Sequence, residues 1–142
     1  EEQEELWRRL QRFEFDVPGA CFTFEQRLAR ENAWSLDFAM RAVQEYKRFV
    51  FLCMFEPPAT PSFQVDQVWH LHLTFTRNYW EQLCGRVLPR PLHHQPTKGG
   101  PQEHTKFWHQ YARTRSAYER YFGPPPLDLW PPPELRFGRD TH

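Results

Sequence analysis

The sequence lacks several features that mark familiar functional classes. Its 18 basic and 18 acidic residues balance to a formal net charge of zero, so no overall field attracts nucleic acid or an anionic membrane. Nucleic acid is therefore not favoured as a partner. The longest apolar run, Phe49 to Phe55, is about a third of the length that a membrane-spanning helix needs. Since no signal peptide is visible either, we expect no membrane span in this chain.

Cysteine is scarce as well. Cys21, Cys53 and Cys84 are odd in number, lie far apart and form no CxxC motif, which argues against a disulfide framework or a cysteine-rich zinc site. We expect a reducing compartment, the cytoplasm, with all three thiols packed as small buried apolar side chains. The GxSxG, P-loop and dinucleotide-binding motifs are also missing, so no common catalytic pattern is visible.

Aromatic residues, in contrast, are abundant. They make up 17% of the chain, although the mean hydropathy is low at −0.81. This combination predicts a core built from Phe, Trp and Tyr rings rather than from many aliphatic side chains. A length of 142 residues fits a single domain, residues 1–142, with one hydrophobic core. The chain begins at Glu1 rather than Met, which suggests a domain taken from a longer protein.

Hydrophobic periodicity predicts an all-α fold, a compact bundle of about five helices. Thr23 and Ser35 have N-cap chemistry, and either Thr60 or Ser62 can cap the fourth helix. Pro57 is expected to end the third helix, whereas glycines end the fourth and fifth. The expected helices are about 2–13, 24–32, 36–55, 61–84 and 102–122.

Proline and glycine predict two segments without helix. The connection 86–101 contains Pro89, Pro91, Pro96 and Pro101 together with Gly99-Gly100, too many breakers for a helix or a central strand. Because proline lowers the entropy of an unfolded loop, we expect this connection to be ordered. The PPPLDLWPPP tail must be extended, and Leu127, Leu129 and Trp130 are expected to hold it on the surface of the bundle.

Histidines concentrate where the fourth helix meets this connection. Asp66 and His70 are four residues apart, so both side chains can reach one point in space, as in the HExxH zinc motif. Adding His94 from the ordered connection creates a two-histidine, one-carboxylate set. Such a set can hold a divalent transition metal, zinc or iron, and leave positions for water or substrate.

His72 fits this set poorly. Two helical residues are separated by about 200° of rotation, so His70 and His72 cannot ligate one ion unless the helix is distorted. Two alternatives follow: Asp66, His70 and His94 form the site, or His72 joins His94 or a group of the fifth helix such as His104. We favour His70 and His94 as the common pair, with Asp66 as a ligand or as the acceptor that sets the imidazole tautomer.

Four segments resemble the glycine-rich domain-containing protein family in its bacterial form, a conserved helical region of unknown function. They are FTFEQRLARENAWSLDFAMRAVQEYKRFVFL, VDQVWHLHLTFTRNYW, LHHQPT and FWHQYARTRSAYERYFG. The resemblance covers Thr23 to Pro133, which divides the chain into an N-terminal helix and turn (1–22), a family core (23–123) and an extended tail (124–142). It implies no established reaction, although some bacterial relatives are fused to membrane segments. The functional set that it implies is Asp66, His70, His72, His94 and Thr97.

A metal-free interpretation competes with the metal site. Asp66 and His70 can form an ordinary helix ion pair, and His94 can fasten its loop to the fourth helix. His72 can be a core histidine that hydrogen-bonds Tyr79 or a loop carbonyl. The leading hypothesis is a cytoplasmic helical domain with a histidine-based metal-binding site, which can serve binding alone or catalysis on a small molecule. The alternative is a protein–protein interaction module in which the cluster is a structural hydrogen-bond network.

Overall fold

A computed structural model describes residues 1–95 and 99–137, and every regular element in these ranges is helical. This confirms the predicted all-α class. The elements within the described ranges number seven rather than about five, because the fourth expected helix is interrupted and the tail contains a short helix of its own. In chain order they are α1 (Glu2–Arg12), α2 (Phe24–Asn32), α3 (Leu36–Phe55), α4 (Phe63–Thr74), η1 (Arg77–Val87), α5 (Pro101–Phe122) and α6 (Pro133–Phe137).

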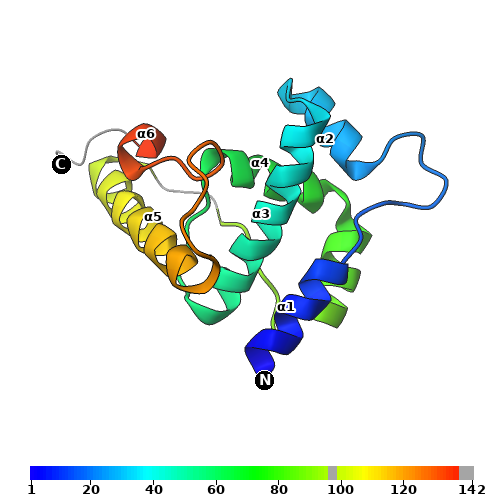
Figure 1. Cartoon of the computed structure of the whole chain (residues 1–142), viewed down its shortest axis with the longest axis horizontal. Helices are drawn as coiled ribbons and strands as arrows, with labels where there is room; N and C mark the ends of the chain where they lie inside the picture. Colours follow the sequence, from blue (N-terminus) through cyan, green and yellow to red (C-terminus); the bar gives the residue numbers. More distant parts are fainter. Residues whose placement is uncertain (96–98, 138–142) are drawn as a thin grey trace.

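The central element is α3. It contacts α1, α2, α4 and α5, and Figure 1 shows it between α5 and α6 on one side and α1 on the other. Every residue from Phe49 to Met54 is buried. The longest apolar run of the sequence, Phe49 to Phe55, is therefore a helix segment that is buried except at its last residue. No helix in the described ranges combines the length and the apolar character needed to cross a membrane.

Local capping chemistry sets the helix starts as predicted. The Thr23 hydroxyl accepts the backbone N–H of Gln26, whose side chain accepts the backbone N–H of Thr23 in return. Ser35 and Ser62 cap α3 and α4 by accepting the backbone N–H three residues further on. Of the two cap candidates for the fourth helix, the structure therefore selects Ser62.

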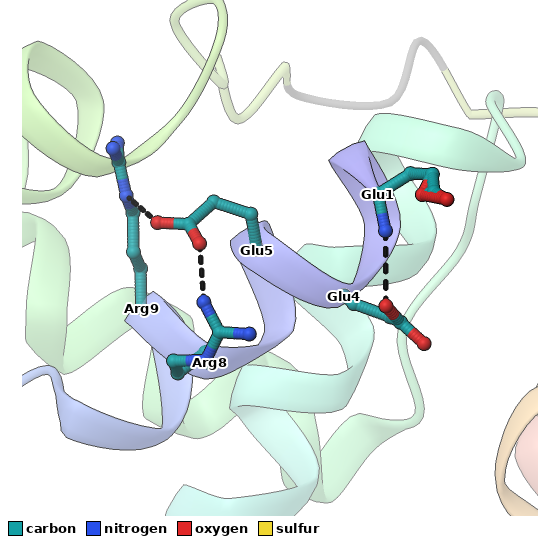
Figure 2. A network of polar contacts seen from close by, with 5 residues as sticks. All are labelled: Glu1, Glu4, Glu5, Arg8 and Arg9. Carbon is teal, nitrogen blue, oxygen red and sulfur yellow. Dashed lines mark hydrogen bonds and ion pairs between the residues drawn. The ribbon is translucent and has the colours of Figure 1, made fainter.

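The charged residues of α1 form ion pairs on the surface of the protein. Glu5 pairs with both Arg8 and Arg9, and the terminal amino group of Glu1 pairs with Glu4 (Figure 2). The Arg9 Nε lies 3.0 Å from the Glu5 carboxylate, and the amino group of Glu1 lies 3.0 Å from the Glu4 carboxylate. All five side chains face solvent, so water and salt screen these pairs. Acidic residues in the first turn and basic residues in the last turn also suit the helix dipole.

The fourth helix is not continuous, so the prediction of one helix to about residue 84 is wrong. α4 ends at Thr74, Phe75 leaves helical geometry with φ −90° and ψ 69°, and the chain then continues as the π-helix η1. Side-chain hydrogen bonds compete with the backbone at this point, since the Thr74 hydroxyl donates to the Leu71 carbonyl at 2.7 Å. Asn78 donates to the distant Glu14 carbonyl at 3.1 Å, which holds the start of η1 to the segment after α1.

The core is aromatic, as predicted. Its largest fully buried side chains include Trp130, Tyr46, Tyr79, Tyr111 and Tyr118. The cysteine prediction holds only in part, because two thiols are buried whereas Cys21 is exposed in the connection between α1 and α2. The prediction that Cys21 is buried is therefore wrong, because the residues around it form an exposed turn.

The tail enters the core instead of lying on the surface. Leu129 and Trp130 are fully buried, and the Trp130 indole N–H donates to Oε1 of Glu45 at 3.0 Å. Leu127, in contrast, is 66% exposed. The prediction of a wholly extended surface tail is thus wrong, because a buried carboxylate on α3 gives the indole a partner and α6 follows at once.

Candidate metal centre

Asp66, His70 and His94 converge at one place. Asp66 and His70 lie on successive turns of α4, and His94 lies in the connection that follows η1. The His94 Nε2–H donates to Oδ1 of Asp66 at 2.8 Å, while the His70 Nε2 is 3.3 Å from Oδ2. The two imidazole centroids are 4.8 Å apart. The carboxylate therefore accepts a hydrogen bond from His94 and lies close to His70, and the proximity predicted for His70 and His94 is present.

The separations approach those of a metal site. One ligand atom from each of the three residues lies within 4.8 Å of the others. Zinc with bonds of about 2.0–2.1 Å and tetrahedral geometry keeps its ligand atoms about 3.3 Å apart. Bringing ligand atoms that lie within 4.8 Å of one another to this separation requires side-chain shifts of at most about 1.5 Å. The His70 side chain is 51% exposed, which leaves one side of the cluster open to water.

His72 lies in the core and outside this cluster. Its Nε2–H donates to the Asn78 Oδ1 at 2.6 Å, so its Nδ1 is the acceptor of the Tyr46 hydroxyl at 2.8 Å. Phe15 and Tyr79 pack edge-on against the ring at 4.7 and 5.0 Å between centroids. Burial lowers the pKa of His72 to about 4, because apolar surroundings disfavour the charged imidazole. Of the four candidate ligands the structure unites three and gives His72 a structural position.

The remaining candidates are placed elsewhere. His93 is exposed and packs against the ring of Trp80 at 5.3 Å between centroids. His104 on α5 donates to the backbone carbonyl of Phe137 at the end of α6. The functional role implied for Thr97 falls on a residue outside the described ranges. Surface cavities of about 620 and 380 Å³ are lined by α1 and its neighbours, and neither lining includes the three converging residues.

Two buried aromatic side chains support the segment that carries His94. The Trp69 indole N–H donates to the Tyr79 hydroxyl at 3.0 Å, and this hydroxyl donates to the carbonyl of Leu92. The Trp69 ring also packs on the His94 imidazole, with centroids 4.3 Å apart. Because Trp69 directly precedes His70, α4 supplies one imidazole and the surface on which the other rests. The sequence predicted an aromatic core in general but not this contact with His94.

If the three converging side chains hold zinc, we expect Tyr79→Phe to weaken zinc binding about five-fold while preserving the helical content. The substitution removes the hydrogen bond to Leu92, and a buried hydrogen bond contributes about 1 kcal/mol. Tyr111→Phe is the matched control, because Tyr111 is equally buried and donates to the Pro131 carbonyl at 2.6 Å, outside this segment. Calorimetric titration with zinc compares the two variants. Equal affinities would show that Tyr79 does not order the loop.

Comparisons of the chain with protein-family models, curated proteins and solved structures found no match. The resemblance to the glycine-rich domain-containing protein family therefore stays a prediction. Function has to be argued from the three converging side chains and their surroundings.

Proposed function

We propose that this chain is a metal-binding helical domain in which Asp66, His70 and His94 hold a divalent transition metal, zinc or iron. Convergence of the three side chains is the observation that carries the proposal. Residues 66 and 94 are 28 positions apart, yet one ligand atom from each of the three groups lies within 4.8 Å of the others. Two imidazoles with one carboxylate form a donor set used by catalytic zinc and by non-haem iron.

Three protein ligands leave coordination positions for other molecules. Asp66 and His94 are 18% and 23% exposed at their side chains, whereas His70 is half-exposed, so the open side faces solvent past His70. A metal in such a position can polarise a bound substrate or activate water. The proposal therefore extends to catalysis on a small molecule.

The alternative function is a metal-free module that binds another protein. It is favoured by the hydrogen bond from His94 to Asp66, which by itself fastens the loop to α4 without any ion. In this case the cluster stabilises the surface of the connection, and the partner is a protein rather than a small molecule. The two functions differ in a measurable quantity, the metal content of the folded chain.

The proposed location is the cytoplasm. Cys21, Cys53 and Cys84 are all free thiols, and free thiols persist in reducing compartments. A secreted chain with an exposed thiol at Cys21 would be open to oxidation.

Elemental analysis tests the proposal on protein purified without a histidine tag. We expect one equivalent of metal per chain, absent in His70→Ala and His94→Ala at unchanged helical content. His93→Ala is the matched control, because it removes the exposed neighbouring imidazole and should keep the metal. Metal at one hundred times its dissociation constant should also stabilise the chain by about 2.7 kcal/mol.

Two results would reject the proposed metal site. A folded wild-type chain that carries no metal, and whose melting temperature ignores added zinc, iron and copper, would reject the metal site and support the hydrogen-bond network. Metal retained in both ligand variants would also reject the assignment of these residues.

A further inference from the structure

The cavity of about 380 Å³ lies beside α1. Three segments line it: α1, the C-terminal end of α3, and residues 86–90, which begin in the last turn of η1. α1 contacts both α3 and η1 (Figure 1). The volume falls within the range of about 300–1,000 Å³ that is typical of small-molecule sites. Because the lining excludes Asp66, His70 and His94, this cavity is separate from the candidate metal centre.

One wall of the cavity is apolar. Its members are Leu6, Met54, Phe55, Val87, Leu88 and Pro89. Leu6, Met54 and Leu88 belong to the buried core, so the core itself forms the floor of the cavity. Water against such a floor lacks hydrogen-bond partners, and an apolar group that displaces this water binds favourably.

Hydrogen bonds at the end of α3 hold this wall in place. The Arg90 Nη2 donates to the carbonyls of Cys53 and Met54, at 3.2 and 3.0 Å. The last turn of α3 contains no basic residue, so Arg90 supplies the cation that its carbonyls favour. The Leu88 N–H donates to the Leu83 carbonyl at 2.9 Å, which fixes residues 86–90 to η1. The cavity is therefore formed in the free chain, and a ligand pays little to order it.

Charged side chains line the rest of the cavity. They are Glu2, Glu5, Arg9, Arg86 and Arg90. Glu5 is already paired with Arg8 and Arg9. Glu2 lies in the first turn of α1, where the helix dipole favours a carboxylate. Both carboxylates are thus stabilised by α1 itself, and neither calls for a cationic ligand.

The arginines of residues 86–90 have donors to spare. In residues 1–95 and 99–137, Arg86 makes no hydrogen bond or ion pair, and Arg90 uses only its Nη2. A guanidinium carries five N–H donors in a planar fork that matches the two oxygens of a carboxylate. Two such groups beside an apolar wall favour a ligand with a negative head and a hydrocarbon body.

We propose that this cavity binds a small amphipathic anion, an aliphatic carboxylate. Its hydrocarbon chain lies against the apolar wall, and its carboxylate pairs with Arg86 and Arg90. The buried chain supplies most of the affinity, because each buried CH₂ group strengthens binding, while the two arginines select for the negative head. The inference goes beyond the proposed function, since it needs neither the metal nor its ligands.

Octanoate is the probe that tests this assignment. Isotope-labelled full chain is titrated with octanoate and, separately, with octanol at constant ionic strength, while backbone amide shifts are followed by nuclear magnetic resonance. We expect saturable shifts concentrated in α1, the end of α3 and residues 86–90. Octanol, which lacks the charge, should bind about five-fold more weakly or worse. Hexanoate should bind about ten-fold more weakly than octanoate, because it buries two fewer CH₂ groups.

Two variants separate the head from the chain. Arg86→Gln should raise the dissociation constant for octanoate about five-fold and leave that for octanol unchanged. Arg12→Gln is its matched control, because Arg12 is an exposed arginine of α1 outside the lining. Val87→Trp should fill the cavity and abolish binding of both probes, whereas Val17→Trp, at a half-exposed position outside the lining, should not. If Val87→Trp does not fold, Arg86→Gln decides, since it removes no polar contact of the described chain.

Four results would overturn the inference. They are the absence of saturable shifts, octanol binding as tightly as octanoate, octanoate binding unchanged in Arg86→Gln, and binding retained in a folded Val87→Trp. Shifts centred on His70 and His94 would place the carboxylate at the candidate metal centre and would also reject the cavity. A chain without metal leaves this inference standing, so its failure and that of the proposed function are distinguishable.

Discussion

Trp130→Ala is expected to lower the free energy of unfolding by about 3–5 kcal/mol, the cost typical of removing a buried tryptophan. Trp130 is fully buried and lies against Tyr111 and Tyr118, with centroids 6.0 and 5.5 Å apart. Its indole N–H is also one of the donors to the buried Glu45 carboxylate, so the substitution leaves a charged group with fewer partners. The loss should therefore lie at or above the upper end of this range.

Urea denaturation monitored by circular dichroism measures the effect. Leu127→Ala is the matched control from the same tail, because its side chain is 66% exposed and its loss should change stability by no more than about 0.5 kcal/mol. Trp130→Phe separates the two causes, since it keeps most of the ring volume and removes only the indole donor. If Trp130→Ala were as mild as Leu127→Ala, the tail would not belong to the core.

Acidification from about pH 6.5 to pH 4 is expected to remove roughly 3 kcal/mol of stability through His72 alone. The pKa of His72 is about 4 in the folded chain, against an ordinary value of 6.5, because burial opposes the charged form. Between these values the unfolded chain binds the proton more readily than the folded chain does. The contribution of neutral His72 to the free energy of unfolding is therefore complete above pH 6.5 and is lost progressively as the pH falls toward 4.

His72→Gln isolates this contribution from the other titrating groups. We expect the His72→Gln variant to be less stable than the wild type at neutral pH. Because glutamine does not titrate, the difference in the free energy of unfolding between the two should shrink as the pH falls. Free energies of unfolding measured in urea at several pH values give that difference. His93→Ala, which removes an exposed imidazole outside the core, is the matched control. A difference that is constant with pH would mean that His72 does not remain neutral in the folded chain.

Much of the helical fold could be predicted because its signals are local. The hydroxyl caps at Thr23, Ser35 and Ser62 act within three residues, and the apolar stripe of α3 lies within one element. The break after Thr74 could not be predicted in the same way, since it involves Asn78 and the carbonyl of Glu14, 64 residues apart. The long-range partners of a polar side chain are not visible in local sequence.

The same distinction explains the tail and the candidate site. Proline content predicts an extended tail, but Trp130 enters the core because Glu45, 85 residues away, accepts its N–H. Within the site, the spacing of Asp66 and His70 was readable. The two-residue offset of His72 argued against its sharing an ion with His70, and the structure places His72 in the core. The contact of Trp69 with His94 was not predictable, because it depends on how separate segments pack.

A metal bound by both His70 and His94 would have a consequence for unfolding. A metal held by His70 and His94 would cross-link two points of the chain separated by 24 positions, and η1 lies between them. By the loop-entropy argument used for disulfides, a closed loop of about this length restricts the unfolded ensemble by roughly 3 kcal/mol. Amide hydrogens of η1 should therefore exchange with solvent more slowly in the metal-loaded chain, even though none of its residues touches the ion.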